Sequence, residues 1–432
     1  MSHNFNKEQI EKVRNILSKH TDSKLVTHIN ACVHCGLCGS SCVFYKTFND
    51  PKYIPGKKID LVASLYKRYN TLLGRIAPSV VHARELTDEM ITEMVDLLFG
   101  GCTMCGRCVP HCSIGVDIPF IVRTGRRLLA EMNRIPLSLK ATADTALAAQ
   151  NNMGIVEEEF LDTIQWMEEE LQDELGDTKA QIPINQENNN VLYTLNPREV
   201  KFFPLSISAA AKIFYAAKEQ WTISSKMYDV TNYGYFTGDN TTASTIAKNM
   251  FDEVLRLKSS TLVLGECGHG SRALRWEAPN FLKQHPDFNI ITLIEIIEQY
   301  LKEGRIKVDK YLNTQKYTLH DPCNITRNGG LFNSLRYVMQ NIVPELIEMT
   351  PYGAENFCCG GGGGMLAMSE YNDRRLKVGE IKAEQIRKTD ANVVITPCHN
   401  CIDQLSQLNH TYKLNVEIKS VAEIVADALV IV

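Results

Sequence analysis

Cysteine is the residue type in this sequence with the most chemical potential. The 432-residue chain carries 14 cysteines. The opening stretch MSHNFNKEQIEKVRNILSKH is polar and has no apolar signal-peptide core, so we expect a cytoplasmic protein that begins with an amphipathic helix. In a large chain without a secretion signal, clustered cysteines are typical of metal ligands or catalytic thiols rather than disulfides.

Eight of the cysteines form two runs of identical spacing, CVHCGLCGSSC and CTMCGRCVPHC. Both read C-x2-C-x2-C-x3-C, in which three thiolates bind one [4Fe–4S] cube and the fourth binds the other cube. Gly36 and Gly106 are expected to let the backbone pass close to the clusters. We therefore expect a first cluster on Cys32, Cys35, Cys38 and Cys112, and a second on Cys102, Cys105, Cys108 and Cys42.

Structural zinc is the alternative for these runs, but zinc sites usually have two C-x2-C pairs about one loop apart. The fourth cysteine of such a run is usually followed by proline, but here Val43 and Ser113 follow it. This departure should not abolish cluster binding, because proline is not a ligand. We interpret His34 and His111 as hydrogen-bonding or surface residues, because the cysteines already complete each cube. Four arginines could offset cluster charge, contact a partner, or form a solvated helix face: Arg107, Arg123, Arg126 and Arg127.

A second group of five cysteines lies near the end of the chain, in HDPC, CCG and PCHNC. A four-iron cube needs four ligands, so five thiols indicate an unusual cluster or a catalytic thiol. Adjacent Cys358 and Cys359 cannot easily bind one small ion, but they could bind different irons of a larger cluster. Gly360 and Gly361 would allow positive φ and turn backbone N–H groups toward sulfide or an anion. A flexible linker is the alternative for the glycine run.

The elements that must position the first eight cysteines are helices. KIDLVASLYKRYNTLLGRI and TDEMITEMVDLLF lie between the two runs and leave no room for a compact β-type ferredoxin. An acidic bridge follows, with Phe160, Ile164, Met167, Leu171 and Leu175 at helical spacing before the polar NQENNN. This pattern predicts an α-helical two-cluster module and then a helical bridge.

The remainder reads as a degenerate internal repeat. YTLNPREVKFFPLS parallels YTLHDPCNITRNGG, YFTGD parallels FCCGG, and LVLGECGHG parallels VVITPCHNC. Short apolar strands alternate with amphipathic helices, which predicts α/β units with parallel strands and ligand groups at the strand ends. The first copy keeps only Cys267, opposite Cys398, and so should bind no cluster of its own. Cys267 is either a further ligand or reactive thiol, or a leftover buried cysteine.

The pattern C…CCG…C-x2-C resembles the CCG domain of the heterodisulfide reductase family. With two ferredoxin motifs ahead of it, nearly the whole chain is similar to the D subunit of that family. It also resembles the K subunit of the sulfite-reductase-associated membrane complex and the iron–sulfur subunits of transmembrane cytochrome complexes. Iron–sulfur subunits of glycolate and lactate oxidation are more distant. The resemblance implies a non-cubane [4Fe–4S] cluster, the site of disulfide cleavage, on Cys323, Cys358, Cys359, Cys398 and Cys401.

Three histidines flank these cysteines: His269, His320 and His399. Each is a candidate proton donor, since disulfide reduction needs protons as well as electrons. The alternative is a hydrogen-bonding role beside the ligands.

The fold expected from these patterns is a multidomain α plus α/β chain, with a helical ferredoxin module followed by two tandem α/β repeats of the CCG type. The expected divisions are a two-cluster domain at 1–140, an acidic helical bridge and linker at 141–190, a degenerate repeat at 191–312 and an intact CCG domain at 313–432.

Two functions fit. In the first, electrons pass through the two cubes to the third cluster, which reduces or forms a disulfide on a small molecule or small protein. In the second, the chain only relays electrons between a flavoprotein and a quinone or cytochrome partner. The expected partners are a membrane cytochrome b-type or other quinone-interacting subunit, which would hold the chain at the cytoplasmic membrane, and further electron-transfer subunits.

Composition limits the other possibilities. The net charge of −4 gives no basic face for nucleic acid. No apolar run approaches the ~18 residues of a membrane span. We expect no flavin or NAD on this chain, because GGGGG lacks the strand-to-helix setting and the acidic partner of a dinucleotide fingerprint.

Overall fold

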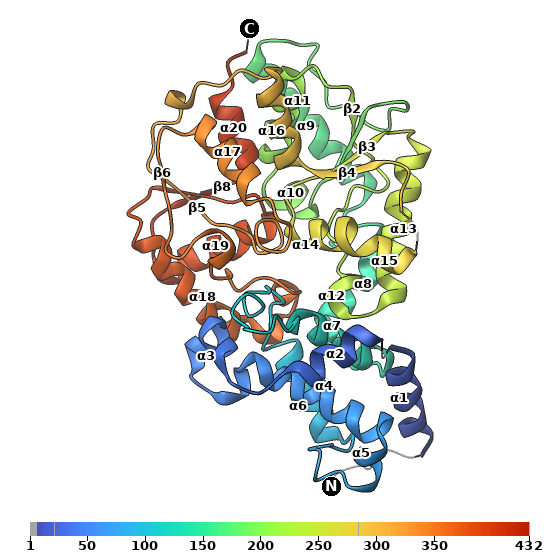
Figure 1. The fold of residues 1–432 in the computed structure, drawn as a ribbon. Helices are drawn as coiled ribbons and strands as arrows, with labels where there is room; N and C mark the ends of the chain where they lie inside the picture. Colours follow the sequence, from blue (N-terminus) through green and yellow to red (C-terminus); the bar gives the residue numbers. More distant parts are fainter. Residues whose placement is uncertain (1–6, 21, 284, 432) are drawn as a thin grey trace. The chain divides into compact units, whose positions relative to one another are not determined.

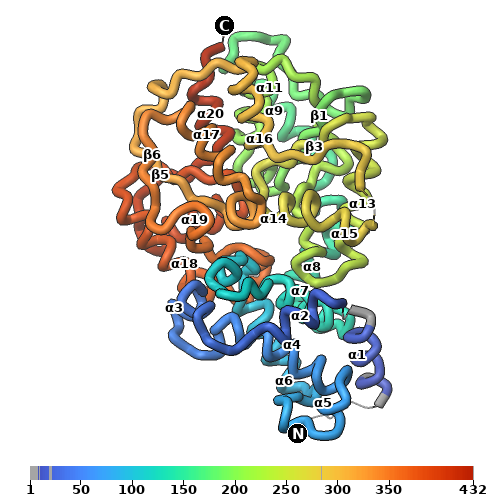
Figure 2. Tube along the Cα trace, viewed as in Figure 1, coloured from blue at the N-terminus to red at the C-terminus, as the bar shows by residue number. Residues whose placement is uncertain are grey.

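The computed structural model describes residues 7–20, 22–283 and 285–431. The chain forms two compact units, and its path can be followed in Figures 1 and 2. The first unit comprises Met1–Lys140, Gly234–Asn240 and Gly360–Ile381. The second comprises Ala141–Tyr233, Thr241–Cys359 and Lys382–Val432. Two short segments from the second half of the sequence therefore belong to the same unit as the two cysteine runs.

The described part of the first unit is helical. Its helices are α1 (Lys7–His20), α2 (Ser23–Ala31), α3 (Val43–Phe48), α4 (Pro55–Asn70), α5 (Leu72–Ile76), α6 (Asp88–Leu98), α7 (Ile118–Glu131) and, in an inserted segment, α12 (Gly234–Thr237). Helix α1 lies in the stretch where an amphipathic helix was expected, and residues 1–6 of that stretch lie outside the described residues.

Helices α4, α6 and α7 pack together and form the frame of this unit. Helix α4 begins with Pro55, whose missing N–H costs nothing in a first turn. Helix α6 begins at the N-cap Thr87, whose hydroxyl accepts a hydrogen bond from the N–H of Met90. A Cβ on Gly125 of α7 would lie 2.5 Å from a methyl of Leu98 and 3.0 Å from one of Val62. The close packing of the three helices therefore requires glycine at this position.

The segment Gly360–Ile381 is attached to this frame by side-chain contacts. Arg374 donates a 2.7 Å hydrogen bond to the carboxylate of Asp96 at the end of α6. The hydroxyl of Ser138 donates a 2.6 Å hydrogen bond to Glu370. The first contact joins the chain that follows the adjacent cysteines to α6, between the two cysteine runs, and the second joins it to Ser138, which follows the second run.

The second unit contains two four-stranded sheets, and all strand pairs in both are parallel. The strand orders are β2-β1-β3-β4 and β6-β5-β7-β8, which is the same order in the two sheets. The strands are β1 (Val191–Tyr193), β2 (Trp221–Thr222), β3 (Thr261–Leu264), β4 (Asn289–Thr292), β5 (Tyr317–Leu319), β6 (Leu346–Ile347), β7 (Val393–Ile395) and β8 (Glu417–Lys419). The predicted parallel α/β architecture is confirmed.

Helices cover both sheets, with α11 against α20 and α16 against α17. The helices assigned wholly or mainly to this unit are α8 (Leu137–Ala149), α9 (Glu157–Leu175), α10 (Pro197–Phe202), α11 (Leu205–Ala216), α13 (Asn240–Arg256), α14 (Gly268–Gly270), α15 (Ala278–Leu282), α16 (Leu293–Glu303), α17 (Phe332–Ile342), α19 (His399–Tyr412) and α20 (Val421–Ala428). Helix α18 (Asn372–Arg387) belongs to the first unit over residues 372–381 and to this unit over its last turns. One apolar core includes residues of both sheets and of helices α9, α11, α16, α17 and α20.

The acidic helix α9 joins this core through one face. Phe160, Ile164, Met167 and Leu171 are buried, as their helical spacing predicted, while its glutamates begin the helix. Phe160 stacks on Tyr228, with ring centroids 4.2 Å apart. Among the described residues, no helix is both long enough and apolar enough to span a bilayer.

We predict that Phe160→Ala destabilises the second unit by about 3–5 kcal/mol, because a fully buried ring is replaced by a cavity. Leu161→Ala is the matched control, since Leu161 is the next residue of the same helix and is exposed. Urea unfolding of both variants under anaerobic conditions measures the effect. Equal losses in the two variants would contradict the packing role of Phe160.

Candidate metal centres

The eight cysteines of the two runs line two separate cavities in the first unit. A cavity of about 110 Å³ is lined by Cys32, Cys35, Cys38 and Cys112. A second, of about 30 Å³, is lined by Cys42, Cys102, Cys105 and Cys108. The structure thus brings the fourth cysteine of each run together with the first three of the other run.

The two runs have the same local backbone. Gly36 and Gly106 both adopt left-handed conformations, with φ of 78° and 76°. His34 and Met104, two residues earlier, are also left-handed, with φ of 55° and 54°. This conformation turns successive cysteines toward the same cavity, and the glycines permit it without a Cβ penalty.

The spacing of the sulfurs fits a cluster better than a single ion. A tetrahedral zinc ion with Zn–S bonds of about 2.3 Å holds its sulfurs roughly 3.8 Å apart. Among the described residues, no three of the eight cysteines have sulfurs that all lie within 4.8 Å of one another. The donor set in each cavity is therefore too wide for one ion and consists of the thiols that iron–sulfur clusters use.

The first cavity lies at the surface. Cys35 is exposed, and the apolar side chains beside the cysteines are exposed as well: Val33 by 71%, Leu37 by 57% and Ile114 by 50%. Burial raises the pKa of the Cys32 thiol, and the nearby carboxylate of Asp60 raises it further. The first cavity is thus open, has an apolar rim and includes a negative charge.

The second cavity has buried cations beside it. Burial raises the pKa of Cys102, and the positive charges of Lys58 and Arg126 oppose this effect. Lys58 is buried and donates a 3.0 Å hydrogen bond to the carbonyl of Tyr53. Arg107 is buried and donates a 3.0 Å hydrogen bond to the carbonyl of Ser41.

The solvated-face alternative is therefore wrong for Arg107 and Arg126. Lys58 was missed by the sequence analysis, because it reads as the polar start of an amphipathic helix. Its burial depends on the packing of α4 in the assembled unit.

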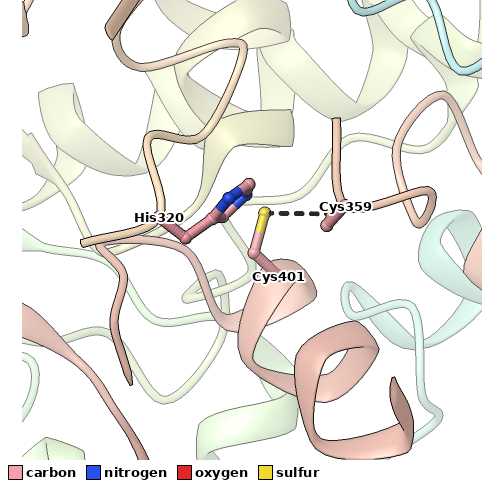
Figure 3. A group of neighbouring side chains, drawn as sticks. All are labelled: His320, Cys359 and Cys401. Carbon is pink, nitrogen blue, oxygen red and sulfur yellow. Dashed lines mark hydrogen bonds between the residues drawn. The ribbon is translucent and has the colours of Figure 1, made fainter. Parts of the chain in front are cut away.

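The third group of cysteines lies in the second unit, where Cys398 comes after strand β7 and begins helix α19. The sulfurs of Cys359 and Cys401 are 3.6 Å apart, and the ring of His320 lies beside them (Figure 3). The ligand atoms of these three residues all lie within 4.8 Å of one another, and all three residues are buried.

Cys398 joins this group through its sulfur. A hydrogen bond with Cys401, together with the N–H of Gly268 at 3.3 Å, lowers the pKa of Cys398 to about 7. Cys358 is buried beside Cys359, and the half-buried Cys323 lies in the loop three residues after His320. Cys398 therefore ionises more readily than an ordinary cysteine thiol.

Cys267 is placed next to this group, at the end of strand β3 and the start of α14. Burial raises its pKa, and the charge of Cys398 raises it further. Three N–H donors surround its sulfur: the amides of Asn196 at 3.6 Å and Asn400 at 3.7 Å, and the backbone of Gly270 at 3.4 Å. Two side chains and a backbone amide thus face this sulfur, which lies near a predicted ligand.

A buried polar chain leads away from His320. The amide of Asn356 lies 3.3 Å from Nδ1 of His320, and Lys382 donates a 2.6 Å hydrogen bond to the amide oxygen of Asn356. Burial and then the charge of Lys382 lower the pKa of His320 well below its usual value, so the ring is neutral. The sequence analysis missed Lys382 and Asn356, because a lysine in the helical GEIKAEQIRK reads as a solvated residue.

Lys382 is a candidate counter-charge for this group. It is buried, and burial lowers its pKa to about 7. The negative charges of Asp321, Cys359, Cys358 and Cys401 oppose this shift. A bound cluster with ionised ligands would favour the charged form of this lysine.

His399 belongs to a separate buried group with two carboxylates. Its Nε2 lies 3.3 Å from the carboxylate of Glu199. Burial lowers the pKa of His399, but Glu199 and then Glu266 outweigh this and raise it to about 9. Burial raises the pKa of Glu266 to about 8, although the charge of His399 opposes this. His269, the third candidate histidine, is buried, stacks on Tyr233 and contacts the amide of Asn400.

The glycine run adopts left-handed φ at three positions: Gly360 at 101°, Gly363 at 63° and Gly364 at 88°. Gly361 is not among them. The run contacts other parts of the first unit, since a Cβ on Gly363 would lie 2.7 Å from the carbonyl of Thr103. These contacts argue against a flexible linker.

Comparison with known proteins places both cysteine regions in described families. Residues 28–116 match the 4Fe-4S dicluster domain. Residues 317–406 match the cysteine-rich domain known as CCG. These two matches cover the two runs and the five-cysteine group, but not the region around Cys267.

Longer similarities extend along the whole chain. An Hdr-like menaquinol oxidoreductase iron-sulfur subunit 2 of Archaeoglobus fulgidus is 26% identical, over 98% of this chain and 83% of that protein. The D subunit of the dihydromethanophenazine:CoB–CoM heterodisulfide reductase of Methanosarcina acetivorans is 23% identical, over 97% of this chain and 98% of that protein. An EtfAB:quinone oxidoreductase of Syntrophomonas wolfei is 21% identical, over 88% of this chain and 55% of that protein.

The fold and the cysteine sites together define an iron–sulfur protein with a dicluster domain and a CCG domain. Within this class, the chain is similar over nearly its whole length to the D subunit of heterodisulfide reductase and to Hdr-like iron–sulfur subunits. It is an iron–sulfur subunit of the kind that transfers electrons in oxidoreductase complexes.

We predict that the thermal unfolding midpoint falls between pH 7 and pH 9.5. The pKa of His399 is raised from 6.5 to about 9, so its ion pair stabilises fully below pH 6.5 and is lost as pH rises through about 9. The raised pKa of Glu266 acts in the same direction, because its favoured neutral form is lost as pH rises through about 8. His399→Gln should flatten the dependence over this range.

The matched control is His410→Gln, which changes an exposed histidine at the end of the same helix. Thermal scans of the iron-loaded proteins at half-unit pH steps provide the measurement. If the control flattens the profile as much as His399→Gln, the buried ion pair is not its cause.

Proposed function

We propose that this chain takes electrons at the first cysteine cavity, passes them to the second, and uses them at the five-cysteine site to reduce a disulfide or, in reverse, to form one. The two cavities would hold [4Fe–4S] cubes, and Cys323, Cys358, Cys359, Cys398 and Cys401 would hold a third, non-cubane cluster. Bound there, this cluster would supply one-electron transfer and iron sites with affinity for sulfur.

The observation that carries this proposal is the convergence of buried thiols in the second unit. Cys359 and Cys401 lie in sulfur contact, Cys398 shares a hydrogen bond with Cys401, and His320 completes the group. A site of this composition suits sulfur chemistry at iron. The reaction would be RSSR′ plus two electrons and two protons giving RSH and R′SH, so two one-electron deliveries are needed for each turnover.

The two cubes would suit sequential one-electron delivery. An exposed ligand, Cys35, and the apolar rim of Val33, Leu37 and Ile114 make the first cavity the better place for exchange with a partner protein. The second cavity has the buried cations Lys58, Arg107 and Arg126 beside it, and their positive charges favour an added electron. We infer that electrons enter at the first site when the reaction runs toward thiols.

The residues around the thiols have distinct proposed roles. Asn356 would fix the His320 ring with its proton on Nε2, so that this nitrogen donates a hydrogen bond toward the sulfurs. Lys382 would offset the charge of the ionised thiolates. Cys267 would act as a further ligand or a reactive thiol, supported by its position beside Cys398.

We also propose that the two sheets represent a duplicated module, with divisions near 191–312 and 313–432. The identical strand orders support this, as does the position of Cys267 and Cys398 after corresponding strands β3 and β7. The first copy would then have lost its metal and kept its packing role.

A purely electron-relaying function is the second candidate, and burial favours it. Cys358, Cys359, Cys398 and Cys401 are each at most 7% exposed, so a substrate would have to approach through the half-buried Cys323. Two relatives are named as quinol or quinone oxidoreductases. In this reading the partners are a flavoprotein and a membrane quinone or cytochrome subunit, and the latter would hold the chain at the cytoplasmic membrane.

Because each cavity takes its fourth cysteine from the other run, we predict that serine variants from different runs alter the same cluster signal. Cys112→Ser should alter the same cluster signal as Cys32→Ser, and Cys42→Ser the same signal as Cys102→Ser, because each pair faces one cavity. Low-temperature EPR of the reduced proteins measures the signals. Pairing of Cys112→Ser with Cys102→Ser instead would show that each run binds its own cluster.

The disulfide function predicts about twelve iron atoms per chain, in three four-iron clusters. It further predicts a thiol-dependent EPR signal, which Cys358→Ser should abolish while the two cube signals remain. The measurement combines iron, sulfide and zinc analysis with an EPR titration using small thiols and disulfides.

The matched control is Thr396→Val, which changes a buried side chain two residues before Cys398 and removes no thiol. Iron near eight atoms per chain would remove the third cluster, and zinc at the His320 group would replace it with a single ion. A third cluster without any thiol-dependent signal would favour the relay.

A further inference from the structure

Arg126 is a fully buried side chain whose four hydrogen bonds all go to backbone carbonyls of the first unit. It lies on helix α7 and is 0% exposed. Its guanidinium donates to Leu98 at 2.9 Å, Phe236 at 2.8 Å, Gly363 at 2.7 Å and Cys102 at 2.9 Å. No carboxylate is among these acceptors, so the positive charge is shared among carbonyl dipoles.

These carbonyls come from separate parts of the sequence. Cys102 is the first thiol of the second cysteine run, and Gly363 lies in the glycine run that follows Cys358 and Cys359. Phe236 lies in YFTGD, the sequence that corresponds to FCCGG. One planar guanidinium thus joins a predicted cluster ligand to both of these segments, a task that needs several donors in a fixed geometry.

The glycine segment approaches the second run directly as well. A Cβ on Gly363 would lie within 2.7 Å of backbone atoms of Thr103, the residue after Cys102. A Cβ on Gly238 would lie 2.5 Å from the backbone of Arg126 itself. Both segments therefore pack by backbone against this part of the unit, and Arg126 connects them.

The chain also links this contact to the third group of cysteines. Gly363 follows Cys359 by four residues, and a chain spans at most about 3.6 Å per residue. Their Cα atoms are therefore separated by no more than about 14 Å, by covalent geometry alone.

We propose that Arg126 is a positioning residue that clamps the glycine run onto the second cysteine motif, and that its charge raises the reduction potential of the cluster bound there. The claim about the reduction potential rests on the proposed cluster in the second cavity. A buried positive charge stabilises the reduced, more negative cluster, and low local dielectric strengthens the effect.

Two measurements distinguish the clamping of the glycine run from the effect of the Arg126 charge on the reduction potential. Hydrogen–deuterium exchange of the amides in residues 360–365 reports the clamp, and an EPR-monitored redox titration reports the potential of the second cluster. Arg126→Met should raise the exchange about tenfold, which corresponds to about 1.4 kcal/mol. It should also shift the second cluster to a more negative potential and leave the first cluster unchanged.

Arg126→Lys keeps the charge but has no planar fork to reach several carbonyls. We expect faster exchange in this variant with a potential near that of the unaltered chain. The matched control is Arg127→Met, one residue along the same helix, where a half-buried arginine pairs with Glu131. Neither readout should change in that variant.

The inference is overturned if Arg126→Met leaves both readouts unchanged, or if Arg127→Met changes them equally. If the Arg126→Met protein binds no iron, the Arg126→Lys protein provides the test. Unaltered amide exchange in residues 360–365 of Arg126→Lys would overturn the clamp. Iron analysis of the unaltered chain keeps the two proposals apart. An empty second cavity would contradict the proposed function, and the exchange experiment would still test the clamp.

Discussion

Burying several thiols together opposes their ionisation, and much of this structure is arranged around that constraint. Metal binding needs thiolates, yet burial raises the pKa of Cys102, Cys108, Cys267 and other cysteines of the three groups. The fold places opposing charges nearby, with Lys58 and Arg126 at the second cavity and Lys382 at the third group. The exposed first cavity relies on solvent instead.

The three sites therefore differ in exposure and in the charges that surround them. The first has an apolar, open rim with a nearby carboxylate, which suits contact with another protein. The second has buried cations beside it, which would suit an added electron. The third has converging thiols, one with a pKa lowered to about 7, beside a neutral histidine. Each environment would suit one step of the electron path that we propose.

Sequence reasoning recovered the features that depend on local spacing. The helical first region and the parallel α/β remainder followed from apolar periodicity and are confirmed. The crossed grouping of Cys42 and Cys112 was expected from motif chemistry, and the structure brings these residues together as expected. Lys58, Lys382 and Asn356 were missed, because each looks polar and ordinary in its own helix or loop. Their importance arises from burial, which is a property of packing between distant segments.

The sequence by itself determined which residues could bind metal, because ligand identity and spacing within one run are local and covalent. It also indicated a degenerate copy of the CCG-like pattern that keeps only Cys267. Only the tertiary structure decided which charges face each group of thiols. It alone decided that YFTGD and the glycine run meet at the guanidinium of Arg126, over sequence separations of 110 and 237 residues. A side chain's local sequence does not specify which remote carbonyls it will meet, since that depends on how whole elements pack.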